Sequence, residues 1–362
     1  LFSNKNKYFN QSKSTLMVLK KIKKIIGNNS IVGQSRLLTR LINDENYFKC
    51  QYCGRCISGC IFDSIYKPSQ DLDKLIKNNS INYRNNIIVK KMSQMNNKIK
   101  VFFFDINRNK NDFIIFDRVF LAAGAIESTR IMVESNNLYP VHMNLKTKSQ
   151  IIFPLFTKTS LQTDWPNLNT QPDVFLEHKN SQNYQHWIHT QINTKNDLIL
   201  NLFPFKNIQN KFLFYFKKMI MNHFFVAHAT VHSKYSDYYK LEFIKKNNEN
   251  ILNINLNENI ASKEYLNLTQ KNLCEIFNKA SFYVLKSLVK KLTYSTHVGS
   301  SMPMTKKPVL NNHTDIFGVP KNWKNLHIVD ASILPSLPAT PIGLLIAANA
   351  MRIASDIKIY NI

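Results

Sequence analysis

The run from residue 294 to 357 constrains the fold most, because it joins a strand that ends in an acid to an apolar helix. Residues 325–332 alternate apolar and polar side chains as a strand does, and they stop at Asp330 followed by two small residues. In α/β proteins the carboxyl ends of such strands line the crevice that holds a ligand. The sequence therefore predicts an α/β fold in which Asp330 faces a bound molecule.

A Pro-rich bend leads from this strand to the helix. Thr340 and Pro341 have the chemistry of an N-cap followed by a proline at the first helical position, and residues 342–357 continue as a largely apolar segment. A helix this apolar is predicted to be buried. Its N-terminus offers unpaired backbone N–H groups and a partial positive charge, which favour an anion.

A histidine precedes both elements, in a strand-like piece from Tyr294 to Met302. Gly299 interrupts this piece and lets the backbone approach a ligand closely, because no side chain intervenes. His297, held at that place, can exchange protons near neutral pH. The alternative is a structural histidine whose hydrogen bonds are satisfied within the fold.

Earlier segments predict strands and a turn that suit a cofactor. Residues 86–104 are typical of two strands joined by a polar turn. Residues 117–121 form a third strand, residues 122–125 a turn of small side chains, and a helix follows from Ile126. Small side chains allow a backbone to come directly against a cofactor.

Two groups of segments resemble signatures of the glucose-methanol-choline (GMC) flavoprotein oxidoreductases. Residues 297–300, 325–332 and 335–354 resemble the C-terminal signature of that family, and residues 117–130 resemble another. The resemblance implies an FAD-binding, Rossmann-like α/β (α+β) fold with a substrate domain built on an antiparallel sheet. It also implies oxidation of an alcohol CH–OH group to a carbonyl, with hydride transfer to flavin N5.

The same resemblance implies the site residues. His297 would be the base, and the FAD contacts would lie at Val89, Ala123, Gly124, Asp330, Ala331, Pro341, Ile342 and Gly343. Val89 would meet adenine through its backbone, with plain sheet packing as an equal alternative. The family usually places a second His or Asn near the start of the last helix, where this chain has Pro341, which cannot donate a hydrogen bond.

The glycine-rich dinucleotide turn of the family is not found in this sequence. The chain has eight glycines and no Gly-x-Gly-x-x-Gly arrangement, and it begins with Leu1. We therefore expect a fold that is incomplete at the N-terminus: a partial FAD-binding domain in 1–137, a substrate domain in 138–290 and the C-terminal FAD-binding part in 291–362. The alternative function is an inactive or split half that needs a separate dinucleotide-binding chain.

A cysteine run forms a separate motif. Cys50, Cys53, Cys56 and Cys60 have the C-x2-C-x2-C-x3-C spacing of iron-sulfur proteins, with Gly54 between them. Three readings stay open: an iron-sulfur cluster, a structural zinc site, or free cysteines. The first would allow a third function, that of an electron-transfer subunit.

Composition excludes some classes of partner. The formal net charge is +25, yet the lysines and arginines are scattered among Asn and Ile with no recognition motif, so nucleic acid is not expected. No apolar run is long enough to span a bilayer, and four of five cysteines lie close together, which favours a cytoplasmic protein.

Residues 14–26 predict a basic amphipathic helix that docks on its own domain or, less favoured, lies on a membrane. The aromatic run 212–221 is either buried core or a lipid-facing entrance.

Overall fold

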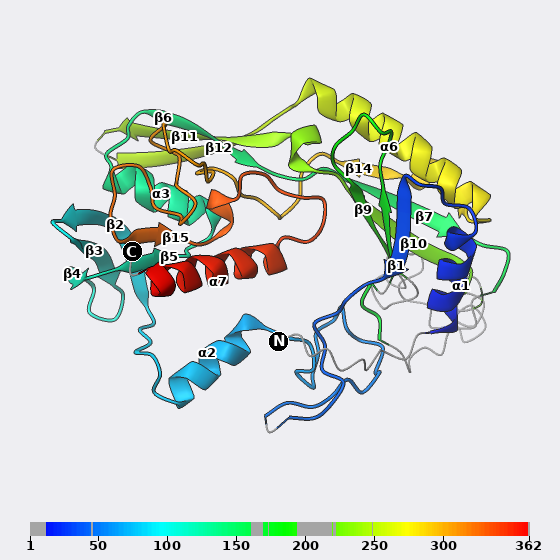
Figure 1. Ribbon diagram of the computed structural model, residues 1–362, viewed down its shortest axis with the longest axis horizontal. Coiled ribbons are helices and arrows are strands. Elements are labelled where there is room, and N and C mark those ends of the chain that lie inside the picture. Colours follow the sequence, from blue (N-terminus) through cyan, green and yellow to red (C-terminus); the bar gives the residue numbers. More distant parts are fainter. Residues whose placement is uncertain are drawn as a thin grey trace. The chain divides into compact units, whose positions relative to one another are not determined.

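The computed structural model describes residues 12–44, 46–160, 169–172, 174–193, 219, 222–247 and 249–360. The chain folds into two compact units that interleave along the sequence (Figure 1). The first unit holds Leu1–Asn82, Ile151–Thr230 and Asn267–Lys291, and the second holds Tyr83–Gln150, Val231–Leu266 and Leu292–Ile362. These units do not coincide with the three domains expected from the sequence.

The first unit is organised on an antiparallel sheet with strand order β1-β8-β9-β10-β7-β13, and β14 also pairs with β7. Its strands alternate buried and partly exposed side chains, as expected for a sheet with one face on a core. The strands are β1 (Ser30–Gln34), β7 (Gln150–Phe156), β8 (Val174–His178), β9 (Ile188–Asn193), β10 (Phe224–Thr230), β13 (Tyr283–Val284) and β14 (Lys290–Leu292).

Helices cover this sheet, and aromatic side chains fill the space between them. Phe153 of β7 meets Phe277 of α6 (Ile260–Lys279) with ring centroids 5.6 Å apart, and Phe225 of β10 meets Phe282 at 5.3 Å. Figure 1 shows α1 (Lys13–Lys23) beside β1. Ser12 caps α1, which buries Val18, Leu19 and Ile22, so the prediction of a helix docked on its own unit is confirmed. Among the described residues, the other helices of this unit are α2 (Pro68–Lys77) and the short η2 (Lys286–Leu288), and Met219 is also helical.

The second unit contains three small sheets. One has the strand order β2-β3-β4, one β12-β11-β6, and one pairs β15 with β5 in parallel. The strands are β2 (Ile87–Met95), β3 (Lys98–Asp105), β4 (Lys110–Phe116), β5 (Val119–Leu121), β6 (Val141–Lys146), β11 (Tyr238–Lys246), β12 (Glu249–Asn257) and β15 (Leu326–Ile328). The strands expected at 86–104, 117–121 and 325–332 are thus present.

Helices of the second unit enclose the parallel pair. They are α3 (Ala125–Ser135), η1 (Ser233–Tyr235), η3 (Ala331–Ile333) and α7 (Gly343–Tyr360). Ile353 and Ile357 of α7 join the core cluster that also holds Ile131 of α3, Leu121 of β5 and Ile328 of β15. The order β5, α3 and later β15 is the strand, helix and strand arrangement that an α/β fold requires.

The expectation that α7 is buried is wrong for one of its sides. Leu344, Leu345 and Met351 are 54%, 41% and 66% exposed, whereas Ile353 and Ile357 are buried. The helix therefore packs through Ile353 and Ile357 and leaves the apolar side chains of Leu344, Leu345 and Met351 largely exposed.

The end of α6 and the aromatic run 212–221 are the next features that the sequence predicted. The helix expected to reach Lys290 ends at Lys279, because Ser281 takes a positive φ of 60° and the chain then enters β13. The aromatic run 212–221, apart from Met219, lies outside the described residues, as does Asp173. No helix among the described residues has both the length and the apolar character needed to cross a membrane.

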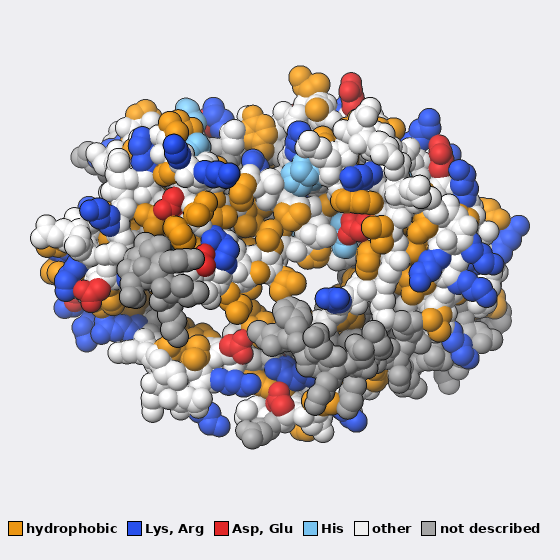
Figure 2. Space-filling view, in the orientation of Figure 1, with side chains coloured by type: hydrophobic (Ala, Val, Ile, Leu, Met, Phe, Trp, Pro, Cys, Tyr) orange, Lys and Arg blue, Asp and Glu red, His pale blue; other side chains and the backbone are white. Residues whose placement is uncertain are grey.

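The surface charge is dispersed on the visible face. Figure 2 shows Lys and Arg side chains distributed among uncharged and hydrophobic ones, without a single basic stripe. This is the distribution expected from the scattered lysines of the sequence.

Gly318 provides a test of backbone packing in the second unit. Its φ is +73°, and an added Cβ would collide with the carbonyl oxygen of Ile328 in β15. We expect Gly318→Ala to lower the free energy of unfolding by about 2 kcal/mol or more, measured by urea unfolding. Gly27→Ala is the matched control, because nothing lies within 4 Å of its Cβ position. Equal midpoints for the two variants would contradict the assigned backbone.

Candidate functional site

The carboxyl group of Asp330 ties β15 to the start of α3. One oxygen accepts hydrogen bonds from Gly124 N at 2.9 Å and Ser128 Oγ at 2.5 Å. The other accepts from Ser332 N at 2.9 Å and Ser332 Oγ at 2.6 Å. Each oxygen thus has two donors, and Asp330 is only 7% exposed. The four acceptor sites of the carboxylate are therefore taken within the chain, and a contact between Asp330 and a bound molecule stays a prediction.

What Asp330 positions is the turn between β5 and α3. Ala123 and Gly124 are exposed, Gly124 has φ +90°, and an added Cβ there would meet nothing within 4 Å. The N–H of Ala123 is bound to Ser128 Oγ at 3.1 Å. The turn is therefore a fixed stretch of backbone that lies open on one side, which suits the cofactor contact expected at Ala123 and Gly124.

The histidine segment lies directly against the residue after Asp330. A Cβ on Gly299 would stand 2.5 Å from the carbonyl oxygen of Ala331, so only glycine allows this approach. Ser300 N donates to that same oxygen at 2.9 Å, and Gly299 also exchanges backbone hydrogen bonds with Lys146. Ala331 is buried in this contact.

The side chain of His297 is exposed beside this contact. Its backbone N–H is fixed by Ser295 Oγ at 3.2 Å, whereas its ring makes no hydrogen bond to any described residue. Desolvation of the ring and, after it, the positive charge of Lys148 lower the pKa of His297 below its ordinary value. The imidazole is therefore neutral at pH 7 and free to accept a proton.

Lys148 is a site residue that the sequence did not reveal. It is 1% exposed, and its Nζ donates to the carbonyl oxygens of Thr340 at 2.9 Å and Ala339 at 3.3 Å. Burial lowers its pKa to about 8. No signal marked it, because it is one of 48 lysines and arginines and stands in no motif.

The start of α7 differs from the expected cap. The helix begins at Gly343, and Ile342 accepts the first helical hydrogen bond from Ile346 N, so Pro341 lies ahead of the helix rather than at its first position. Ile342 is buried and belongs to one core cluster with Ala331 and Val298. Pro341 and Gly343 are exposed at the helix end.

Val89 lies apart from this group, on the β2 strand. It packs against the core cluster of the second unit, and its carbonyl oxygen accepts from Arg130 Nη2 at 3.2 Å. In the structure Val89 packs within its sheet and against the core. Its predicted backbone contact with adenine stays a prediction.

Hydrogen bonds and packing thus link three elements of the second unit. Asp330 and Ala331 contact the Gly124 turn on one side and the His297 segment on the other, and Ile342 joins the same core cluster at the start of α7. The arrangement presents a free imidazole, an open backbone turn and a helix N-terminus.

The comparison with solved structures supports the fold. Pyridoxine 4-oxidase from Mesorbium loti, a GMC-family oxidoreductase, matches with a TM-score of 0.52 at 15% sequence identity over 75% of this chain. The mixed α/β fold of this chain is therefore similar to that of this oxidase over the matched part. This chain spans 57% of the neighbour's length. No family model and no curated protein matches the sequence.

The cysteine run of the chain lies in the first unit. Its four cysteines, together with Asn169, line a cavity of about 10 Å³, and Cys56 exchanges hydrogen bonds with Thr170. All four thiols are free. Over the described residues, no group of three or more His, Cys, Asp or Glu side chains is arranged to hold a metal ion. The structure therefore does not support an iron-sulfur or zinc site at Cys50, Cys53, Cys56 and Cys60.

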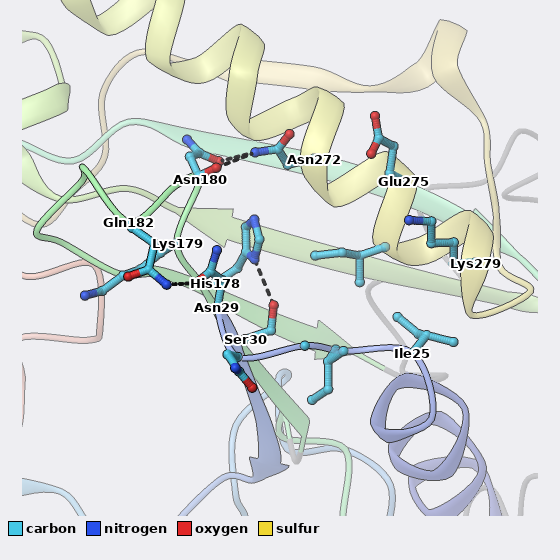
Figure 3. A pocket seen from close by; sticks show the side chains of 14 residues that line it. Ile25, Asn29, Ser30, His178, Lys179, Asn180, Gln182, Asn272, Glu275 and Lys279 are labelled. Carbon is cyan, nitrogen blue, oxygen red and sulfur yellow. Dashed lines mark hydrogen bonds between the residues drawn. The ribbon is translucent and has the colours of Figure 1, made fainter.

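A larger cavity, of about 420 Å³, also lies in the first unit (Figure 3). The figure shows His178 Nδ1 bonded to Ser30 Oγ at 2.8 Å, and Asn272 of α6 bonded to Asn180. The first contact joins β8 to β1, and the second fixes the loop after β8 to α6. None of the residues that line the cavity is an expected site residue.

Asp330 should be more important for stability than an exposed aspartate. We expect Asp330→Ala to lower the free energy of unfolding by about 3 kcal/mol or more, because it removes the acceptor of the Gly124 N–H and leaves the buried donors of Ser128 and Ser332 unpaired. Asp356→Ala is the control, since Asp356 only pairs with Arg352 at the surface, and it should change stability by about 0.5 kcal/mol or less. Thermal unfolding measures both, and a small effect at Asp330 would show that its hydrogen bonds do not hold this corner together.

Proposed function

We propose that this chain is part of an FAD-dependent oxidoreductase that acts on the CH–OH group of a small alcohol. The observation that carries the proposal is the free, exposed imidazole of His297, fixed beside the Ala331 backbone and near the start of α7. A neutral imidazole with no partner in the protein can accept the proton of a substrate hydroxyl. The similarity of the fold to that of pyridoxine 4-oxidase supports the same reaction class.

The residues present fit FAD. The turn at Ala123 and Gly124 is exposed with open space at the Gly124 Cβ position, and the N-terminus of α7 at Gly343 is likewise open. Backbone groups free of side chains can lie against a planar ring or a phosphate, and a helix N-terminus favours negative charge. When bound, FAD supplies the hydride acceptor, N5 of its ring.

The chain's own residues would then act as follows. His297 takes the hydroxyl proton as hydride leaves the carbinol carbon, so the alcohol becomes a carbonyl. The Ser295 hydroxyl holds the His297 backbone, and the Gly299 contact with Ala331 fixes the distance of the segment from the Gly124 turn. Ala331 and Ile342 share a core cluster with Val298, which ties the His297 segment to the start of α7, where Pro341 and Gly343 are exposed for the predicted contact with FAD.

His297→Ala should lower alcohol-dependent dye reduction by about 10² to 10⁴-fold while FAD content stays the same. Activity of the unsubstituted chain should rise with pH through a pKa below 6.5 and stay level near neutral pH, because only the neutral ring accepts a proton.

His142→Ala is the matched control, because His142 is an exposed histidine of the same unit that lies 3.7 Å from Glu242. It should leave both turnover and its pH profile unchanged. Equal turnover in His297→Ala and the unsubstituted protein would exclude His297 as the base.

A second candidate is that FAD binds only when a separate dinucleotide-binding chain is present. The β5–β15 pair favours it, since a parallel sheet of two strands is unusually small and α7 leaves Leu344, Leu345 and Met351 exposed beside it. A strand and helix from another chain, carrying the Gly-x-Gly-x-x-Gly turn, could extend the sheet and cover this stripe.

Flavin titration separates the two candidates. If the chain acts alone, FAD fluorescence is quenched by the chain itself; if it is a split half, quenching requires the added chain and is lost in Leu344→Asp. Ile260→Asp is the control, because Ile260 is 89% exposed at the start of α6. Partner-dependent binding that persists in Leu344→Asp would exclude this stripe as the docking face.

Location and partners complete the proposal. A cytoplasmic location is supported by five free cysteines. The dispersed lysines support a small-molecule substrate rather than nucleic acid.

A further inference from the structure

Lys148 is a buried cation without a counter-ion. It lies in the link between β6 and β7, and no ion pair among the described residues includes it. Its contacts are two neutral carbonyl oxygens, those of Ala339 and Thr340. Removing an ammonium group from water is costly unless its charge is used, so a lysine in this position calls for a reason beyond packing.

The link that carries Lys148 runs antiparallel to the segment that carries His297. Thr147 Oγ1 bonds to both the N–H and the carbonyl oxygen of Ser295, at 3.0 and 3.1 Å, and Ser149 Oγ donates to Thr293 O at 2.8 Å. Lys146 bridges to Gly299. Residues on both sides of Lys148 are thus tied to residues on both sides of His297.

Lys148 also reaches the other end of the proposed site. Thr340 and Ala339 directly precede Pro341, which has no N–H with which to fix its own position. The ammonium group therefore joins the His297 segment to the approach of α7. Lys146 makes a comparable bond, to Pro335 O at 2.8 Å, but it is less buried.

We propose that Lys148 is a positioning residue of the site: it places a positive charge next to the segment that carries His297, and its N–H groups fix the Ala339–Thr340 backbone at the entrance to α7. The proposal rests on the proposed function, in which His297 must be neutral to accept a proton. A cation beside an imidazole disfavours the charged form of the ring, whereas two neutral carbonyl groups do not.

Other titratable groups around this corner do not replace Lys148. Asp237 accepts from Asn259 N, His232 bonds to Ser336 Oγ, and Lys146 bonds to Pro335 O. Tyr239 of β11 and Tyr294 lie close enough to influence each other. Among the described residues, Lys148 is the charged group that lowers the pKa of His297, after the larger effect of desolvation.

The test compares variants that separate charge from hydrogen bonding. Lys148→Gln keeps an N–H donor and removes the charge, whereas Lys148→Arg keeps both. Lys146→Gln is the matched control. The readout is the pKa of the His297 ring, followed by NMR on the full chain with labelled histidine, in which His297→Ala identifies the signal.

We expect the His297 pKa to rise by roughly half a unit or more in Lys148→Gln and to stay low in Lys148→Arg and Lys146→Gln. With FAD bound, the acid limb of the kcat/KM profile should move up by the same amount in Lys148→Gln. An unchanged His297 pKa in Lys148→Gln overturns the proposal and leaves Lys148 as a structural residue.

The outcome does not depend on turnover. If the chain proves inactive while the His297 pKa still responds to Lys148, the proposed function fails and the electrostatic coupling stands. If Lys148→Gln does not fold, Lys148→Arg still decides, because a His297 pKa that rises although the charge is retained contradicts an effect of charge.

Discussion

The carboxyl group of Asp330 is the interaction on which the second unit depends. Two of its four hydrogen bonds join the end of β15 to the start of α3, about 200 residues away in the sequence, and the other two hold Ser332 at the start of η3. An ionised carboxylate that accepts several bonds away from water holds its donors in nearly fixed positions. That geometry sets the positions of the Gly124 turn and the η3 helix. It also sets the close approach of Gly299 to the Ala331 backbone.

Local chemistry was sufficient to predict the elements around this carboxylate. The alternation before Asp330 predicts β15, the small residues after Leu121 predict the turn, and Gly299 marks a close backbone approach. Each of these signals arises within a few residues of the feature that it indicates, so tertiary context had little opportunity to override it. What the sequence did not predict is the direction of the Asp330 side chain, which depends on donors far along the chain.

Properties set by long-range packing were not predictable. Nothing in the sequence distinguishes Lys148 from the other lysines. Its neighbours Thr147 and Ser149 bond to Ser295 and Thr293, and these long-range bonds place Lys148 in the interior. The apolar composition of α7 predicts burial all round, yet only its stripe at Ile353 and Ile357 meets the core. The four cysteines have a metal-binding spacing, but metal binding requires their thiols to converge in space, which spacing alone does not guarantee.

The interleaving of the two units has a consequence for how the chain becomes folded. Each unit is assembled from three separate stretches, and the sheet of the first unit pairs β7 with strands that follow more than 100 residues later. Such non-local pairing makes folding slow and leaves apolar strand edges open while synthesis continues. Neither unit can be completed before much of the other has emerged from the ribosome. For the same reason, a single proteolytic cut cannot release either unit as one continuous fragment.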